Sequence, residues 1–459
     1  MSAASDSDHK PAGPLISRPQ GPLRGTIQVP GDKSISHRSI IFGTLAVGET
    51  TVDGLLEAED VLCTIDAMRA CGAQISKDPS GRWHVHGVGV GGLTSPESVV
   101  DLGNSGTAAR LILGALTPQR LTATLSGDAS LSKRPMRRVL TPLEQMGAIF
   151  VCRDGDRLPI TIEGAADPMP ITYEMPVASA QVKSAILLAA LNTPGTTTVI
   201  EKKATRDHTE RMLRHFGVPV EVEDAAFGQR ISITGQVDLT PAHVVVPGDI
   251  SSAAFPIAAA LLTPGSEITI ENVGLNPLRD GFLRAIEKMG ARIAVQNERD
   301  QNGEPVADLE VHHGPLTGAE IPAEWAPSMI DEYPILSVLA AAADGQTVMR
   351  GLEELRVKES DRLAAMAQGL TACGVQLDEL EDGLIIQGSP NQGALAGGAQ
   401  VETFLDHRIA MSFLTLGLAT RDPVEIDDAS MIMTSFPDFI PLMTQLGARF
   451  SAPTGKSGQ

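Results

Sequence analysis

The sequence predicts an α/β protein in which six repeated units form two three-unit domains with a ligand cleft between them. Three observations support this fold class: a glycine motif that recurs six times, a polar motif that opens an apolar helix in each unit, and a Pro-Gly-Asp motif that occurs twice. Self-similarity at a regular spacing is typical of repeat architectures. A chain of 459 residues is long enough for two or three such domains.

The first motif is a helix end, a glycine and an alternating apolar strand. Its glycines are Gly72, Gly147, Gly217, Gly290, Gly374 and Gly447, roughly 70 to 85 residues apart. Glycine at this position is expected to end a helix in the left-handed conformation. We therefore expect six amphipathic helices that end at these glycines.

The second motif places a polar cluster at the start of an apolar helix. These clusters begin at Lys33, Asn104, Ser179, Asp249, Asp331 and Asp406. A helix that is apolar all round is expected to be buried. Each unit of about 75 residues then holds one buried helix, one amphipathic helix and several short strands.

Two Pro-Gly-Asp motifs, at Pro30–Asp32 and Pro247–Asp249, indicate where the chain crosses between the domains. One domain is predicted to be 32–248, and the other to be 15–31 together with 249–459. Ligands commonly bind between domains, so the cleft between them is the expected site.

Composition narrows the class of function. Acidic residues outnumber basic ones by 56 to 36, and the net charge of −20 disfavours nucleic-acid binding. Apolar runs such as 186–191 and 335–343 are too short to span a bilayer. The polar N-terminus does not resemble a signal peptide. We expect a soluble, cytoplasmic monomer that binds neither membranes nor nucleic acids, with 1–14 as a disordered lead-in.

Basic residues gather at or near the polar helix starts, where free N–H groups and the helix dipole favour anions. They are Lys33, Arg38, Arg134, Arg206, Lys358, Arg362 and Arg408. Each motif also has a simpler interpretation. Lys358 and Arg362, as i and i+4 neighbours, suit a solvated helix face; Lys33–Arg38 suits a Ser-capped helix; and Gly103–Thr107 suits an ordinary helix-start turn.

Carboxylates at the helix starts are similarly ambiguous. Asp331 could be an N-cap or, beside a lysine, a base. Asp406 could cap its helix while Arg408 binds an anion. Cys63, Cys71, Cys152 and Cys373 lack metal-binding spacing and are expected to be core thiols. No metal or cofactor motif is present, so the residues suit proton transfer and charge stabilisation on doubly anionic substrates.

The chain resembles the 5-enolpyruvylshikimate-3-phosphate synthase family from about Leu15 to the C-terminus. The matching stretches are Pro30–Arg38, Leu102–Thr107, Lys133–Pro135, Ser179–Gln181, Arg356–Arg362, Asp406–Arg408 and Ser435–Asp438. The resemblance implies two domains of three βαβαββ units, each an inside-out barrel. It implies transfer of the enolpyruvyl group of phosphoenolpyruvate to the 5-hydroxyl of shikimate 3-phosphate, through a tetrahedral intermediate and with release of phosphate. It implies no cofactor and no metal.

The resemblance also assigns site residues. Those for shikimate 3-phosphate are Lys33, Ser34, Arg38, Ser179, Ala180, Gln181, Arg206, Asp331 and Lys358. Those for phosphoenolpyruvate are Lys33, Gly106, Thr107, Arg134, Gln181, Arg362 and Arg408. Asp331 is the implied base toward the 5-hydroxyl, with Lys33 and Glu359 as proton carriers.

Three positions qualify this assignment. Many members have Lys where this chain has Thr434, which removes one phosphate contact, and many have Ser at Ala180. Both departures resemble a bacterial branch that includes glyphosate-tolerant enzymes, whose tolerant members often carry Ala at the position of Gly106. We therefore expect glyphosate to inhibit this enzyme and Gly106→Ala to weaken the inhibition.

Two alternatives share the fold, and a third has related repeat units. The sister enzyme that acts on UDP-N-acetylglucosamine usually carries a reactive Cys or Asp in its mobile loop, and 127–134 here has no Cys. A non-catalytic anion-binding protein would not need Lys33, Asp331, Lys358 and Glu359 together. A related RNA-end-processing enzyme is disfavoured by the net charge.

Overall fold

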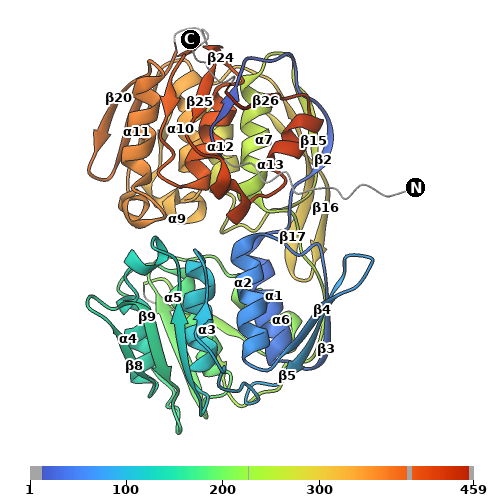
Figure 1. Cartoon of the computed structure of the whole chain (residues 1–459), viewed down its shortest axis with the longest axis vertical. Helices are drawn as coiled ribbons and strands as arrows, with labels where there is room; N and C mark the ends of the chain where they lie inside the picture. Colours follow the sequence, from blue (N-terminus) through green and yellow to red (C-terminus); the bar gives the residue numbers. More distant parts are fainter. Residues whose placement is uncertain (1–12, 226, 390–394, 454–459) are drawn as a thin grey trace, which may run out of the picture.

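The computed structural model describes residues 13–225, 227–389 and 395–453. Figure 1 shows two lobes, one drawn in blue to green and the other in yellow to red with the blue N-terminal strands added to it. Each lobe has its own hydrophobic core, one containing Ile35 to Val246 and the other Leu23 to Val29 with Ile250 to Ala448. These cores support the proposed division at 32–248. Most of the predicted lead-in, 1–12, lies outside the described residues.

The first lobe contains three similar units, each with one four-stranded sheet and two helices. The first unit has β14 (His243–Val245), β3 (Val47–Asp53), β5 (Trp83–Val88), β4 (Gln74–Lys77), α1 (Lys33–Leu45) and α2 (Glu59–Ala70). The second has β6 (Val100–Asp101), β7 (Thr122–Ser126), β9 (Arg157–Glu163), β8 (Ile149–Arg153), α3 (Gly106–Leu116) and α4 (Arg137–Gln145). The third has β10 (Thr172–Glu174), β11 (Thr196–Glu201), β13 (Gln229–Thr234), β12 (Glu221–Asp224), α5 (Ala180–Ala190) and α6 (His208–His215).

The second lobe repeats this plan. Its first unit has β2 (Arg24–Gln28), β15 (Glu267–Gly274), β17 (Glu304–His312), β16 (Ile293–Gln301), α7 (Ile250–Leu262) and α8 (Gly281–Lys288). Its second has β18 (Glu320–Ile321), β19 (Gln346–Met349), β21 (Gly383–Gln387), β20 (Gln376–Leu380), α10 (Tyr333–Ala342) and α11 (Arg362–Ala372), with the short α9 (Ala326–Met329) before α10. Its third has β23 (Gln400–Val401), β25 (Val424–Ile426), β1 (Leu15–Ser17), β26 (Phe450–Ser451), α12 (His407–Leu416) and α13 (Phe439–Gln445), beside a small β22 (Leu395–Gly397) and β24 (Thr420–Asp422) pair.

The sheets share one strand pattern. The first two strands run parallel, joined through a buried helix in four of the units, and the next two add antiparallel. The other sheets have the same strand pattern. In two of them the parallel partner is β14 or β2, a strand that lies next to a domain crossing in the chain. The helices α7, α10 and α12 contact one another in the middle of their lobe (Figure 1). Helices inside and sheets outside confirm the predicted α/β repeat fold.

The six predicted glycines end the amphipathic helices as expected. All six have positive φ, from 81° at Gly217 to 109° at Gly447. At each one the glycine N–H and the following N–H bond back to the last helical turn, as Gly72 does to Arg69 (3.0 Å) and Ala73 to Met68 (3.1 Å). This paired pattern satisfies carbonyls that the helix end leaves free.

The two Pro-Gly-Asp motifs lie side by side where the chain passes between the lobes. The Asp32 N–H donates to the Pro247 carbonyl (2.7 Å), and the Asp249 N–H donates to the Pro30 carbonyl (2.9 Å). The crossing segments therefore brace each other directly.

One local prediction was wrong. Lys358 and Arg362 do not share a helical face, because Lys358 follows the short 3-10 helix Glu353–Val357 and α11 starts only at Arg362. The Asp361 side chain accepts the Ala364 N–H (3.0 Å) and so caps α11 at this point. Among the described residues, no helix combines the length and apolarity of a membrane span.

Candidate active site

The predicted site residues lie where the two lobes meet, and ion pairs cross between the lobes there. Arg206 Nη2 lies 2.8 Å from Asp331 Oδ2, and Arg134 Nη1 lies 3.7 Å from Glu359 Oε1. Each pair joins residues more than a hundred positions apart in the chain. Because these ion pairs connect the two lobes, the candidate site contains residues of both.

Polar residues at the buried helix starts are mostly N-caps. Asp32, Ser105, Ser179, Asp249 and Asp406 each accept a backbone N–H from the first turn of their helix. These caps leave other first-turn N–H groups available to an anion.

Asp331 is not a cap and stands among cations. Its carboxylate pairs with Arg206 and also with Arg362 Nη1 (3.3 Å), and its carbonyl accepts from Arg408 Nη1 (3.0 Å). Burial acts to raise the pKa of Asp331, but Lys358 and these arginines outweigh it and hold that pKa well below 3.8. Asp331 is therefore ionised at neutral pH.

Arg362 binds three carboxylates and is almost fully buried. Its Nε lies 2.8 Å from Asp406 Oδ2, its Nη2 lies 2.6 Å from Glu359 Oε2, and its Nη1 faces Asp331. Burial would raise the pKa of Glu359, but Arg362 and Arg134 hold it well below 4.5. Arg362 thus links the two carboxylates to which proton transfer is assigned.

Lys33 and Lys358 supply the two site ammonium groups. Lys33 Nζ pairs with Asp60, and its charge also acts on Glu359. Burial lowers the pKa of Lys358 from 10.5, although Asp331 opposes that shift. Asp60 belongs to α2 and has no motif around it, so sequence reasoning did not find it.

The start of α3 forms a second part of the site. Gln181 Nε2 donates to Thr107 Oγ1 (3.0 Å), and Gln181 Oε1 accepts from Arg110 Nη1 (2.8 Å). A Cβ added at Gly106 would lie 2.7 Å from Arg110 Nη1 and 3.0 Å from Arg134 Nη1. Both guanidinium groups therefore close around Gly106.

Arg110 is a site residue that sequence reasoning missed. It is buried and also donates to the Gly106 carbonyl (3.0 Å). Burial lowers its pKa to about 10. The available signal was an arginine inside the otherwise apolar helix Gly106–Leu116, where a charge needs a specific partner.

Arg38 is enclosed by hydrogen-bond partners from its own lobe. It is 3% exposed, and its three nitrogens donate to Thr209 Oγ1, the Ser34 carbonyl and Ser184 Oγ at 2.7–2.8 Å. Ser184 in turn donates to the carbonyl of Ala180 (2.7 Å). In this arrangement Arg38 holds the starts of α1 and α5 together.

Thr434 lies beside the start of α12. Its hydroxyl donates to the Met431 carbonyl (2.7 Å) and lies 3.4 Å from His407 Nδ1. Burial lowers the pKa of His407 to about 3, so the ring is neutral. Thr434 therefore supplies no positive charge where many family members have Lys.

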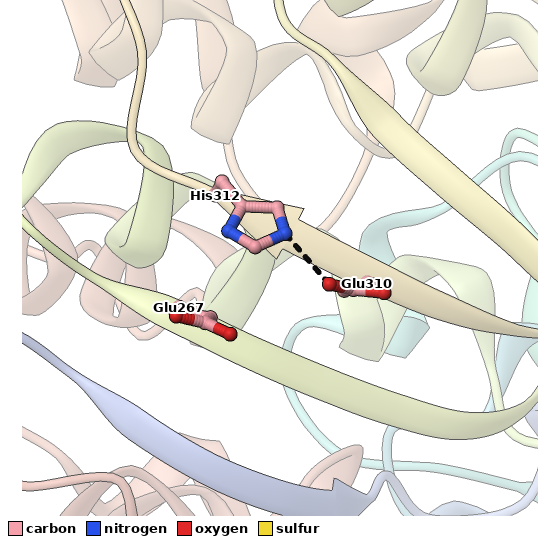
Figure 2. Close-up of side chains that lie close together, drawn as sticks. All are labelled: Glu267, Glu310 and His312. Carbon is pink, nitrogen blue, oxygen red and sulfur yellow. Dashed lines mark hydrogen bonds and ion pairs between the residues drawn. The ribbon is translucent and has the colours of Figure 1, made fainter.

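A group of possible metal ligands lies elsewhere, at the far ends of two strands of one sheet (Figure 2). Glu267 and His312 are cross-strand partners, and His312 Nε2 lies 2.8 Å from Glu310 Oε1. Glu267 and His312 are exposed and Glu310 is partly buried, and Arg24 Nη1 lies 3.7 Å from Glu267 Oε2. His312 lies at one end of β17 and Glu304 at the other, so the two residues are roughly 26 Å apart along the strand. Glu304 is the one that lies at the crossing of the lobes, so the His312 group is separate from the candidate site.

Comparisons with known proteins show the family to which the chain is similar. The family model described as EPSP synthase (3-phosphoshikimate 1-carboxyvinyltransferase) matches residues 17–443. A 3-phosphoshikimate 1-carboxyvinyltransferase of Cereibacter sphaeroides is 58% identical over 446 residues, covering 97% of this chain and 100% of that protein. The enzyme of the same name from Paramagnetospirillum magneticum is 59% identical over 442 residues, covering 96% and 98%.

Solved structures show the same similarity. An EPSP synthase structure from Acinetobacter baumannii superposes with a TM-score of 0.85 at 44% identity, covering 96% of this chain and all of the other. The fold is therefore shared over nearly the whole chain. The chain belongs to the EPSP synthase (3-phosphoshikimate 1-carboxyvinyltransferase) family.

Proposed function

We propose that this chain transfers the enolpyruvyl group of phosphoenolpyruvate to the 5-hydroxyl of shikimate 3-phosphate and releases phosphate. The observation that carries the proposal is the group of cations around Asp331 and Glu359 at the meeting of the lobes. Both substrates are multiply charged anions, and such a group binds them in an otherwise acidic protein. Family membership supports the same reaction.

Phosphoenolpyruvate is assigned to the part of the site between α3 and α12. Its proposed ligands are Lys33, Gly106, Thr107, Arg134, Gln181, Arg362 and Arg408. Arginine forks suit carboxylate and phosphate groups, and the start of α3 offers backbone N–H groups. The side chains of Arg134 and Arg362 already meet at Glu359.

Shikimate 3-phosphate is assigned to the part of the site between α1 and α5. Its proposed ligands are Lys33, Ser34, Arg38, Ser179, Ala180, Gln181, Arg206, Asp331 and Lys358. Arg206 and Asp331 form an ion pair across the lobes, so a substrate bound there contacts both lobes at once. The buried Arg38 acts in this proposal mainly by holding the helix starts.

The proton transfers are assigned to three side chains. Asp331 is ionised, which is the state a base toward the 5-hydroxyl needs. Glu359 is also ionised because Arg362 and Arg134 face it. A substrate anion that binds these arginines offsets their charge and raises the pKa of Glu359, which moves it toward a proton donor. Lys33 is the second proton carrier.

The sister reaction with UDP-N-acetylglucosamine is the second candidate. Burial raises the pKa of Cys63 and Cys71 to about 11, so neither thiol is poised as a thiolate.

We propose that the protein is a cytoplasmic monomer that needs no cofactor and does not bind nucleic acid.

Phosphate release from the purified protein tests the proposal. Phosphoenolpyruvate is supplied with either shikimate 3-phosphate or UDP-N-acetylglucosamine, without added metal. Release only with shikimate 3-phosphate is expected. Release only with the nucleotide sugar would reassign the acceptor, and folded protein that is silent with both would favour a binding protein.

A further inference from the structure

A buried polar turn, Asn276–Arg279, lies between β15 and α8 at the crossing of the lobes. Its own backbone is tight, because the Arg279 N–H donates to the Asn276 carbonyl (2.7 Å) and the Leu278 N–H donates to Asn276 Oδ1 (2.8 Å). Asn276 and Arg279 are 2% and 3% exposed. Neither belongs to a motif that the sequence analysis found.

Arg279 joins the two crossing motifs. Its Nη1 lies 3.1 Å from Asp32 Oδ2, and its Nη2 lies 3.2 Å from Asp249 Oδ1. The same Nη2 donates to Ser251 Oγ (2.7 Å), and that hydroxyl donates to Glu332 Oε1. One planar guanidinium therefore connects the starts of α1 and α7 with Glu332, the residue just before α10.

Asn276 connects the same turn to the loop before α6. Its Nδ2 donates to Asp207 Oδ1 (2.7 Å) and to Glu304 Oε2 (2.9 Å). Glu304 also faces His208 Nδ1 at 2.7 Å. The Asn276 side chain is thus bonded to both lobes.

The acids held by this turn are sequence neighbours of proposed site residues. Asp32 precedes Lys33, Asp207 follows Arg206, and Glu332 follows Asp331. Adjacent side chains share a backbone, so a shift of the acid displaces the neighbouring site residue. Glu332 Oε1 also lies 3.9 Å from Arg408 Nη1.

We propose that the Asn276–Arg279 turn sets the relative positions of Lys33, Arg206 and Asp331 by binding the acidic neighbour of each. Arg279 and Asn276 are then positioning residues for the transfer reaction, and the inference rests on the proposed function.

Arg279→Gln and Ser251→Ala test this role, with Met289→Ala as the control. Met289 is buried on the same helix–turn unit but lies in the apolar core, so its truncation lowers the melting temperature without touching the turn. For each protein, kcat, both KM values, the melting temperature and calorimetric binding of shikimate 3-phosphate are measured below the lowest melting temperature.

Arg279→Gln is expected to lower kcat about 100-fold, the scale on which a displacement of about 1 Å acts. Ser251→Ala keeps every charge but removes the two hydrogen bonds that the hydroxyl makes with Arg279 and Glu332, and it is expected to lower kcat roughly tenfold. Met289→Ala is expected to keep kcat within about twofold at equal or larger loss of melting temperature. If Arg279→Gln does not fold, Arg279→Lys replaces it, because Lys keeps the charge but not the fork.

Wild-type kcat and KM values in both turn variants would overturn the proposal. The proposal would also be overturned if Met289→Ala lost as much kcat as a turn variant with the same loss of melting temperature. The wild-type protein separates this result from the proposed function. A wild type without phosphate release contradicts the reaction itself, whereas an active wild type with unaffected turn variants contradicts only the positioning role.

Discussion

A methyl group at Gly106 is expected to weaken the binding of phosphoenolpyruvate and of glyphosate. The added Cβ lies 2.7 Å from Arg110 Nη1 and 3.0 Å from Arg134 Nη1, against 3.4 Å or more for an ordinary contact. Arg110 must then recede by about 0.7 Å and Arg134 by about 0.4 Å to restore normal packing. Arg110 is held by Gln181 and the Gly106 carbonyl, so it has little room to move.

The size of the effect follows from the arginine that gives way. Arg134 is held by Asn104 (2.6 Å) and faces Glu359, and it is a proposed phosphoenolpyruvate ligand. Weakening one charge-assisted hydrogen bond costs about 1.4 kcal/mol, which is tenfold in a binding constant. Gly106→Ala should therefore raise the KM for phosphoenolpyruvate and the Ki for glyphosate about tenfold each, and leave the KM for shikimate 3-phosphate within twofold.

Steady-state phosphate release with each substrate varied, with and without glyphosate, measures these constants. Gly91→Ala is the matched control, because its Cβ would have no atom nearer than 3.6 Å and its φ is not positive. Equal KM and Ki values for Gly106→Ala and wild type would refute the reasoning. A rise in the KM for shikimate 3-phosphate alone would place the displaced arginine in the other part of the site.

Three other perturbations have defined outcomes. Asp331→Asn should lower kcat about 100-fold or more in the phosphate-release assay, since it removes the proposed base; unchanged kcat would exclude that role. Because the folded pKa values of Asp331 and Glu359 lie below 3.8 and 4.5, both carboxylates stabilise the fold above those values and lose that contribution as the pH falls through the folded pKa values. Urea unfolding from about pH 5 downward should therefore show a smaller loss of stability for Asp331→Asn than for wild type, and parallel curves would contradict this. Arg138 and Glu354 pair across the lobes at 3.2 Å and are about one-third exposed. Arg138→Glu should therefore lower the free energy of unfolding by less than about 1 kcal/mol. The Arg138→Glu, Glu354→Arg double variant, which restores opposite charges, should recover the wild-type value. Gly345→Ala should lower the free energy of unfolding by about 1–2 kcal/mol, because the backbone there has a positive φ and no atom lies close enough to crowd the added Cβ. Equal unfolding midpoints for this variant and wild type would refute this expectation.

The repeat pattern was predictable because it depends on local rules. A glycine that must adopt positive φ after a helix leaves a sequence signal, and Gly72, Gly147 and Gly217 all carry it. A helix that is buried on every side must be apolar, and Ile250–Leu262 is. The start of α11 was not predictable from charge spacing, because capping by Asp361 competed with the i, i+4 pattern.

The sequence also predicted candidate site residues inside motifs, but it did not predict their partners. Arg134, Glu359 and Arg362 were predicted from motifs, whereas the ion pair of Arg134 with Glu359 joins residues far apart in the chain. Arg279 shows the difference most clearly, because its local sequence says nothing of Asp32 or Asp249.

The sequence alone therefore determined the six-unit architecture, the crossing points expected between the domains and the chemical class of the site. The architecture follows from backbone conformation and apolar periodicity, which act over a few residues, and the chemical class follows from the charged residues at the helix starts. Only the tertiary structure decided that Arg38 is enclosed by its neighbours, that Arg110 closes around Gly106 and that Asn276–Arg279 binds the acids beside the site. Those contacts depend on how two lobes pack, and a charge in a sequence does not reveal which distant charge it meets.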